Sequence, residues 1–424
     1  MDFSTSPKVE GLKKRLQAFM DAHVVPVVAQ WEHDVGKGIH PPAVLEPLKA
    51  RAKAEGLWNL FLPTLPKDVP GMGLSVSEYA PLAEIMGRIF WASEVFNCNA
   101  PDTGNMELLH IAATPAQRQQ LLMPLFNGDI RSAFSMTEPD VASSDPTNIA
   151  TRIDKRSGGY VLNGRKWFVS NGADPRCKFM IVMGVTDAAA ERHARHSMVI
   201  VPMDAPGVTI VRQIPILNHA TGDLIAEIFF KDAEIPAENI LGQEGQGFAL
   251  AQARLGPGRI HHCMRTIGQC ELALELMAER AMERTTFGKA LAERDTVREW
   301  IAESRLAIDQ ARLLVMRAAW VIDNHGNKAA RTEVSAIKIV TARMQVAIFD
   351  RAIQVFGAAG LTPDTPLANL FTWGRALRFI DGPDEVHLRG VAKAEFERIK
   401  AMDLKAARYL TPYHAVYGDP TRQE

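Results

Sequence analysis

The chain has 424 residues, of which 47% are hydrophobic and 23% are charged, and its formal net charge is −1. This length allows two or three domains with substantial cores, and the balanced charge argues against a nucleic-acid-binding protein, which needs a basic face. The four cysteines show neither a zinc spacing nor a disulfide framework, and no apolar signal core or bilayer-length run occurs. We therefore expect a reduced, cytoplasmic protein without membrane insertion or a metal.

Residues 1–130 have the pattern of helices separated by loops rich in proline and glycine. The stretch 114–128 illustrates this pattern, because Thr114 can cap a helix, Pro115 fits the first helical position and Gly128 follows the end. We predict an N-terminal helical domain over residues 1–130.

Residues 131–245 change in character to short β-branched or aromatic runs bounded by Gly, Asn, Asp or Pro. Because these runs follow one another closely, without the helices that parallel βαβ units need, they predict an antiparallel sheet or small barrel. The basic segment 191–196, between two such runs, is most simply a solvated hairpin loop. We predict a middle β domain over residues 131–245.

Residues 246–424 are again helical in pattern and are predicted to form a bundle. One stripe of apolar residues recurs every seven positions, with small residues between its members, and a second apolar stripe follows it along the chain. The first comprises Ile301, Ile308, Val315 and Ile322 with Ser304, Ala311 and Ala318; the second comprises Val334, Ile337, Met344, Ile348 and Val355. The run His261–His262–Cys263 is not a metal site, because consecutive helical residues point about 100° apart.

Five motifs occur in order along the chain: FSMTEPDVASSDPTNIAT (134–151), GRKWFVSNG (164–172), RTTFGK (284–289), QVFGAAG (354–360) and DGPDEVH (381–387). In order and spacing this set resembles the acyl-CoA dehydrogenase family across essentially the whole chain. The resemblance implies a mainly α fold with a central β-barrel domain between an N-terminal helical domain and a C-terminal four-helix bundle. The first motif and RLGPGRIHHC (254–263) resemble the subfamily whose animal members carry an upstream kinase-like domain, to which no residues of this sequence correspond.

The resemblance implies FAD as the cofactor, because dehydrogenation of a thioester needs a hydride acceptor. The positions that match the family's flavin-ring contacts are Phe134, Met136, Thr137, Ser143, Phe168 and Ser170, with Phe168 in place of the usual Trp. Arg284, with Thr286 and Phe287, matches the position that reaches the FAD pyrophosphate of a neighbouring subunit. Gln354, Val355, Gly357 and Ala358 match the facing segment, and Glu385 matches an adenosine contact. The resemblance therefore also implies a homodimer or homotetramer.

Asp381 occupies the place of the family's catalytic carboxylate, which is generally Glu and precedes a Gly. Some branches instead place the base one residue before an arginine that matches Arg259, but that position is Gly258 here. The substrate would contact Ser143, Arg259, Ile380 and Gly382. We expect burial against the acyl chain and the flavin to raise the pKa of Asp381 toward a useful range. We expect Asp384, by contrast, to be a first-turn helix acid worth about 1 kcal/mol or less.

The implied function is α,β-dehydrogenation of an acyl-CoA to the 2-enoyl-CoA in fatty-acid β-oxidation. Asp381 would take the α-proton, FAD would take the β-hydride, and the electrons would pass to electron-transfer flavoprotein. Long, branched and 4-phosphorylated acyl chains all remain open as substrates. Two alternatives also stay open: an oxidase on the same scaffold, acting on acyl-CoA or on nitroalkanes (the latter enzymes also use Asp), and a non-catalytic partner that binds flavin or CoA.

Overall fold

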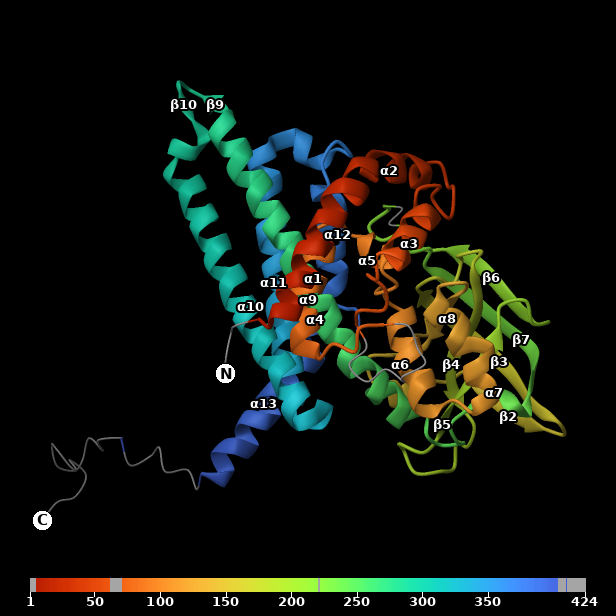
Figure 1. Ribbon diagram of the computed structural model, residues 1–424. Coiled ribbons are helices and arrows are strands. Elements are labelled where there is room, and N and C mark those ends of the chain that lie inside the picture. The colour runs from red at the N-terminus through yellow and green to blue at the C-terminus, as the bar shows by residue number, and fades with distance from the viewer. Residues whose placement is uncertain (1–4, 62–70, 220–221, 403–408, 410–424) are drawn as a thin grey trace, which may run out of the picture.

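A computed structural model describes residues 5–61, 71–219, 222–402 and 409 of the chain (Figure 1). Long helices lie side by side on one side of the molecule, and a sheet lies on the other, with the short helices α6, α7 and α8 beside it. None of the helices in the described part is long and apolar enough to cross a membrane. All four cysteines are buried free thiols.

The N-terminal part is helical, as predicted. Thr114 and Gln117 form a reciprocal capping box, and Gly128 ends α8 in a left-handed conformation with φ 71°, so the two signals found in the sequence act as expected. The helices are α1 (Pro7–Phe19), α2 (Val28–Gly36), α3 (Leu45–Ala54), α4 (Val76–Gly87), α5 (Ala92–Val95), α6 (Asp102–Ala112), α7 (Pro115–Gln117) and α8 (Met123–Asn127), with short π or 3-10 segments η1 (Met20–Val24), η2 (Val25–Val27) and η3 (Arg118–Leu122).

The middle part is one eight-stranded sheet in which β6, β7, β3, β2, β4, β5 and β8 are neighbours in that order, and β1 pairs with β4. The strands are β1 (Arg131–Ser135), β2 (Arg152–Arg156), β3 (Gly159–Val169), β4 (Cys177–Val185), β5 (His196–Pro202), β6 (Val208–Gln213), β7 (Ala226–Pro236) and β8 (Ile240–Leu241); η4 (Pro146–Asn148) and η5 (Ala237–Asn239) are 3-10 turns. Most pairs are antiparallel, as predicted.

The pairing of β1 with β4 is parallel, and β2 meets β4 in parallel at one bridge, so the sheet is mixed rather than wholly antiparallel. A parallel pair needs a long crossover connection. Here the β2–β3 hairpin, rather than a helix, makes the crossover from β1 to β4. The lack of a helical pattern between these strands therefore did not exclude a parallel pair.

The C-terminal part consists of long helices, and the predicted stripes lie in its core. Ser304, Ile308, Ala311, Val315 and Ala318 are buried on α10, and the whole second stripe is buried on α11. The elements are α9 (Gly247–Glu283), β9 (Thr285–Thr286), β10 (Lys289–Ala290), η6 (Leu291–Glu293), α10 (Asp295–Ala329, with a break at Gly326), α11 (Arg331–Phe356), η7 (Gly357–Leu361), α12 (Leu367–Leu377) and α13 (Asp384–Ala401).

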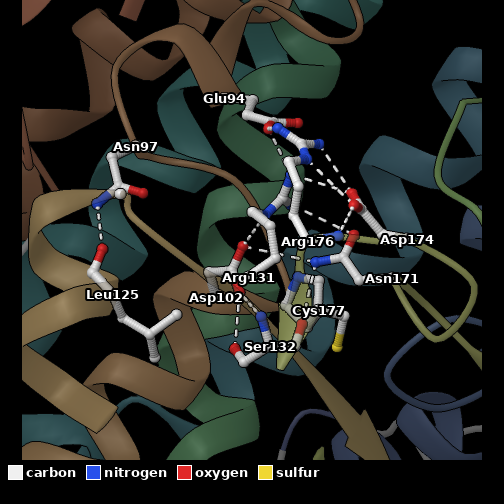
Figure 2. Close-up of polar contacts among 12 residues, drawn as sticks. Glu94, Asn97, Asp102, Leu125, Arg131, Ser132, Asn171, Asp174, Arg176 and Cys177 are labelled. Carbon is white, nitrogen blue, oxygen red and sulfur yellow. Dashed lines mark hydrogen bonds and ion pairs between the residues drawn. The ribbon is translucent and has the colours of Figure 1, made fainter. Parts of the chain in front are cut away.

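A buried ionic cluster ties the N-terminal helices to the sheet (Figure 2). Arg131, the first residue of β1, contacts Asp102 of α6 and lies 2.5 Å from Glu94 of α5. Arg176 bridges the same Glu94 at 2.7 Å and Asp174 at 2.8 Å. Because a buried charge is costly unless it is paired, this cluster fixes how β1 leaves the helical part, and β1 leads directly into the first sequence motif.

Candidate active site

A cavity of about 2190 Å³ lies where the helical parts meet the sheet. Its lining comes from α6, the loop after β1, the end of β3, α9, α12 and α13. All of the site residues predicted near the flavin ring or the substrate line it: Phe134, Met136, Thr137, Ser143, Phe168, Ser170, Arg259, Ile380, Asp381 and Gly382. The structure thus brings together three motifs that are far apart in the sequence.

The aromatic wall of the cavity depends on an irregularity at the end of β3. Phe168 has φ 51° and is 48% exposed, and its register with β7 shifts between Lys166 and Val169. A positive φ is unusual for a bulky side chain and persists only where the surroundings enforce it. Phe168 lines the cavity and Trp167 does not, so the wall position is Phe168, as the motif alignment predicted.

A buried lysine anchors the first motif beneath this wall. Lys166 Nζ donates to the carbonyl of Met136 at 2.8 Å, to the carbonyl of Met183 at 2.7 Å and to Glu138 Oε1 at 2.8 Å. Burial lowers the pKa of Lys166 to about 8, against the opposing effect of the Glu138 carboxylate. The ammonium group therefore links the segment that carries Met136 and Thr137 to the sheet, a role that sequence reasoning missed because it depends on three distant carbonyl and carboxylate groups.

Asp381 lies in the turn between α12 and α13 in a left-handed conformation, with φ 56°. Its carbonyl oxygen accepts hydrogen bonds from Arg259 Nε at 3.0 Å and from His387 Nε2 at 3.2 Å. Asp and Asn tolerate positive φ better than most residues, and the two donors hold the peptide in place. The turn is therefore fixed through the backbone of Asp381, which leaves its side chain to face the cavity.

The carboxylate of Asp381 is surrounded by positive groups. Burial alone would raise its pKa, but the neighbouring His262 imidazole and the cations Arg254, Arg259 and Lys338 together outweigh burial, so its pKa lies below the usual value of 3.8. The pKa is low because α9 and α11 direct cationic side chains at the acid, and an opposite charge favours the ionised form. The rise in pKa that we expect on burial against the acyl chain and the flavin stays a prediction.

Position 258 faces the same point in space. A Cβ added to Gly258 would lie 3.8 Å from Asp381 Oδ2. The two positions at which the family places its base, 258 and 381, therefore lie close together in space. In this chain only Asp381 carries a carboxylate.

Asp384 lies in the first turn of α13, as expected, but it is buried and paired with two arginines. Its side chain is 3% exposed, and Oδ2 lies 3.2 Å from Arg343 Nε and 2.9 Å from Arg378 Nε. Burying a carboxylate requires such partners. Asp384 therefore joins α11, the end of α12 and the start of α13, and we expect it to contribute more to stability than a first-turn acid without such partners.

The remaining predicted cofactor residues lie outside the cavity. Arg284, Phe287, Gln354, Gly357, Ala358 and Glu385 are exposed, Thr286 is half-buried, and the side chain of Val355 is buried in the core. The hairpin β9–β10, next to Arg284, lies at the end of the long helices, well apart from the sheet (Figure 1). One chain does not bring Arg284 to the cavity that holds Phe168.

Other cavity residues were missed by sequence reasoning. Arg254 stacks on the Phe134 ring at 3.9 Å from its centroid, and His262 lies 3.5 Å from Asp381. Arg192 and His193, from the loop interpreted as a solvated hairpin, also line the cavity. Arginine and histidine on a helix face or in a basic loop carry no signal of where they point, so only the fold could reveal these positions.

The chain is similar to known proteins along most of its length. Residues 6–129, 133–233 and 245–396 match the family models of the N-terminal, middle and C-terminal domains of acyl-CoA dehydrogenases. The Mycobacterium tuberculosis protein FadE2, named as an acyl-CoA dehydrogenase, is 53% identical over 95% of this chain and 98% of its own length.

Two further relatives support the same assignment. Mouse acyl-CoA dehydrogenase family member 10 is 51% identical over 94% of this chain, which spans only 38% of that longer protein. A solved structure of a Mycobacterium abscessus protein, assigned to the acyl-CoA dehydrogenases, is 47% identical, with a TM-score of 0.89 over 93% of this chain and 100% of its own. The chain therefore belongs to the acyl-CoA dehydrogenase family.

Proposed function

We propose that this protein is an FAD-dependent acyl-CoA dehydrogenase in which Asp381 takes the α-proton of the thioester. The observation that carries the proposal is the position of Asp381: its carboxylate faces the same cavity as Phe134, Thr137 and Phe168, which match the flavin contacts of the family. The proposed base and the residues that match flavin contacts thus line the same cavity. Removal of two hydrogens from adjacent carbons requires the base and the hydride acceptor to lie this close together.

The residues present fit FAD. Ligand cavities typically measure about 300–1,000 Å³, whereas this cavity measures about 2190 Å³, which gives room for a large cofactor and a second ligand. Phe168 offers an exposed aromatic face, and Thr137 and Ser170 offer hydroxyl groups along the same wall. When bound, FAD supplies a hydride acceptor.

The chain itself supplies the proton chemistry. Asp381 is ionised because its pKa is low, so it is ready to accept a proton at neutral pH. Its backbone N–H finds no acceptor within the described part of the chain, so this donor is free to bond to the thioester carbonyl and stabilise the developing enolate. Arg254, Arg259 and Lys338 add positive charge around the same point.

The active unit proposed is a homodimer or a dimer of dimers. Arg284 is exposed at the end of α9, and no ion pair or hydrogen bond of its side chain is found among the described residues. A guanidinium can bind two phosphate oxygens at once. We propose that Arg284, with Thr286, Phe287 and the segment from Gln354 to Ala358, contacts the FAD pyrophosphate and adenosine of a second subunit.

The proposed electron acceptor is electron-transfer flavoprotein. The aspartate in place of glutamate also favours a second candidate, a nitroalkane oxidase, because those enzymes use Asp as their base. The test is anaerobic mixing of the purified protein with straight, branched and 4-phosphorylated acyl-CoAs and with nitroalkanes. A dehydrogenase bleaches with an acyl-CoA and regains its colour with a dye acceptor or electron-transfer flavoprotein; prompt recolouring by oxygen with peroxide, or bleaching by nitroalkanes alone, would identify an oxidase.

A further inference from the structure

Two adjacent histidines on α9 have different surroundings. His261 is buried between aromatic rings, with centroids 5.8 Å from Phe61 and 4.9 Å from Tyr79. His262 lines the cavity, and its Nε2 lies 3.5 Å from Asp381 Oδ2. Consecutive helical residues point about 100° apart, so only one of the two can face the acid.

The tautomer of His262 is set by Arg265, one turn further along α9. Arg265 Nη2 lies 3.2 Å from His262 Nδ1, and Arg265 Nη1 donates to Ser93 Oγ at 3.1 Å. A guanidinium has only donors, so Nδ1 must be the acceptor of this contact. A neutral imidazole carries one N–H, which then lies on Nε2, the nitrogen nearest to Asp381.

His262 is also kept neutral. Burial, followed by the positive charge of Arg265, lowers the pKa of His262 to about 4, against the opposing effect of Asp381. The titratable and charged groups that act on His262 and Asp381 are Arg254, Arg259 and Arg265 of α9 and Lys338 of α11, and His387 of α13, whose own pKa is lowered to about 4, lies next to Asp381. A proton on His262 would add one more positive charge to a site that already has several.

We infer that His262 is a positioning residue for Asp381: a neutral imidazole, oriented by Arg265, that directs its Nε2–H at Asp381 Oδ2 and leaves Oδ1 for the substrate proton. This inference rests on the proposed function of Asp381 as the base. The distance of 3.5 Å is long for a hydrogen bond, and such contacts tighten when the ligand binds. A neutral donor orients the carboxylate with a smaller loss of basicity than another full positive charge would cause.

The role of His262 also explains how aspartate, which is shorter than glutamate, can act as the base at position 381. Aspartate has one methylene fewer than glutamate, so its carboxylate has less reach and must be aimed from outside. A misplacement of about 1 Å can lower a rate about 10²-fold. Removal of His262 should therefore affect the chemical step rather than the binding of acyl-CoA.

The kinetic test compares three variants of the FAD-loaded protein in stopped flow. His262→Phe keeps a ring but no donor, and should slow flavin reduction about 10–100-fold with little change in acyl-CoA Kd. His262→Gln, whose amide can donate, should stay within about tenfold of the parent. His261→Phe is the matched control and should leave the rate unchanged. Equal rates in His262→Phe and the parent would overturn the inference, as would a loss confined to Kd.

A second readout does not depend on turnover. ¹⁵N-histidine NMR of the resting protein, with the His262 signal identified by its loss in His262→Gln, should show a neutral imidazole with the proton on Nε2 at pH 7. Asp381→Asn should shift this Nε2 signal. A proton on Nδ1, a charged ring at pH 7, or no shift in Asp381→Asn would refute the inference. If no acyl-CoA reduces the parent protein, the proposed function fails, while the NMR result still decides whether His262 orients Asp381.

Discussion

Replacement of Asp381 by asparagine separates the chemistry of this residue from its structural role. The turn is held by the Asp381 carbonyl, which bonds to Arg259 and His387 at 3.0 and 3.2 Å. Asparagine keeps this carbonyl and tolerates the φ of 56°. We therefore expect Asp381→Asn to fold, to bind FAD and to change acyl-CoA Kd by less than about fivefold, below ~1 kcal/mol.

The rate of flavin reduction should nevertheless collapse. A positioned general base is worth about 10²–10⁴-fold, or ~3–6 kcal/mol of activation free energy. The nearby carboxylates do not replace it, because Asp384 is bound to Arg343 and Arg378. The assay is anaerobic stopped-flow bleaching at saturating acyl-CoA, with Kd taken from the concentration dependence.

Asp384→Asn is the informative companion variant. Its loss of charge unbalances two arginines, and we expect it to cost about 1–3 kcal/mol, less than for a fully buried pair because both arginines are partly exposed. The variant should show a lower Tm but a nearly normal reduction rate per folded, FAD-loaded protomer. Normal reduction by Asp381→Asn, or abolished reduction by a folded Asp384→Asn, would show that the base has been assigned to the wrong residue.

Three further predictions follow from the same geometry. Arg284→Ala should lose FAD on dialysis and weaken the oligomer in sedimentation, whereas Arg317→Ala, another exposed arginine, should do neither; full FAD retention would contradict the cross-subunit role. The double variant Asp381→Ala, Gly258→Glu should reduce flavin at least about tenfold faster than Asp381→Ala alone, because a Cβ added at position 258 would lie 3.8 Å from the site of the lost Asp381 Oδ2. Equal rates would contradict the convergence of the two sites. Burial raises the pKa of Glu107 to about 8, above its unfolded value of about 4.3. Between these two pH values the folded state keeps a proton that the unfolded state releases, so stability and Tm fall as pH rises. Glu107→Gln should make Tm depend less on pH over this range, and an unchanged slope would contradict the prediction.

The acid limb of turnover gives a test of the low pKa of Asp381. Because the positive groups keep the carboxylate ionised, kcat/KM should stay level from about pH 7 down to about pH 5. An acid limb centred near neutral pH would show that the surrounding cations do not control the base in the free enzyme.

Local patterns in the sequence were sufficient for much of the fold. The cap at Thr114, the helix end before Gly128 and the small-residue seam of Ser304 and Ala311 depend on residues within a few positions of each other, and all occur as predicted. The parallel pairing of β1 with β4 could not be predicted in this way, because the strands between them form the crossover.

The site divides along the same line. The order of the motifs was sufficient to predict that Phe134, Phe168 and Asp381 lie together, and all three line one cavity. The pKa of Asp381 was not predictable, because the charges that set it come from α9 and α11 and no local pattern shows which way Arg254 or Lys338 points. Asp384 was misjudged for the same reason, since its partner Arg343 lies on another helix.

The most direct test of the central claim is the product of one anaerobic turnover. The purified protein, loaded with FAD, is mixed with each acyl-CoA of the panel, and the thioesters are identified by mass spectrometry as the flavin bleaches. We predict one equivalent of 2-enoyl-CoA for each FAD reduced, with an α-deuterated substrate slowing the reduction in the parent protein. Bleaching without an enoyl-CoA product, or an intact acyl-CoA in every case, would contradict the account.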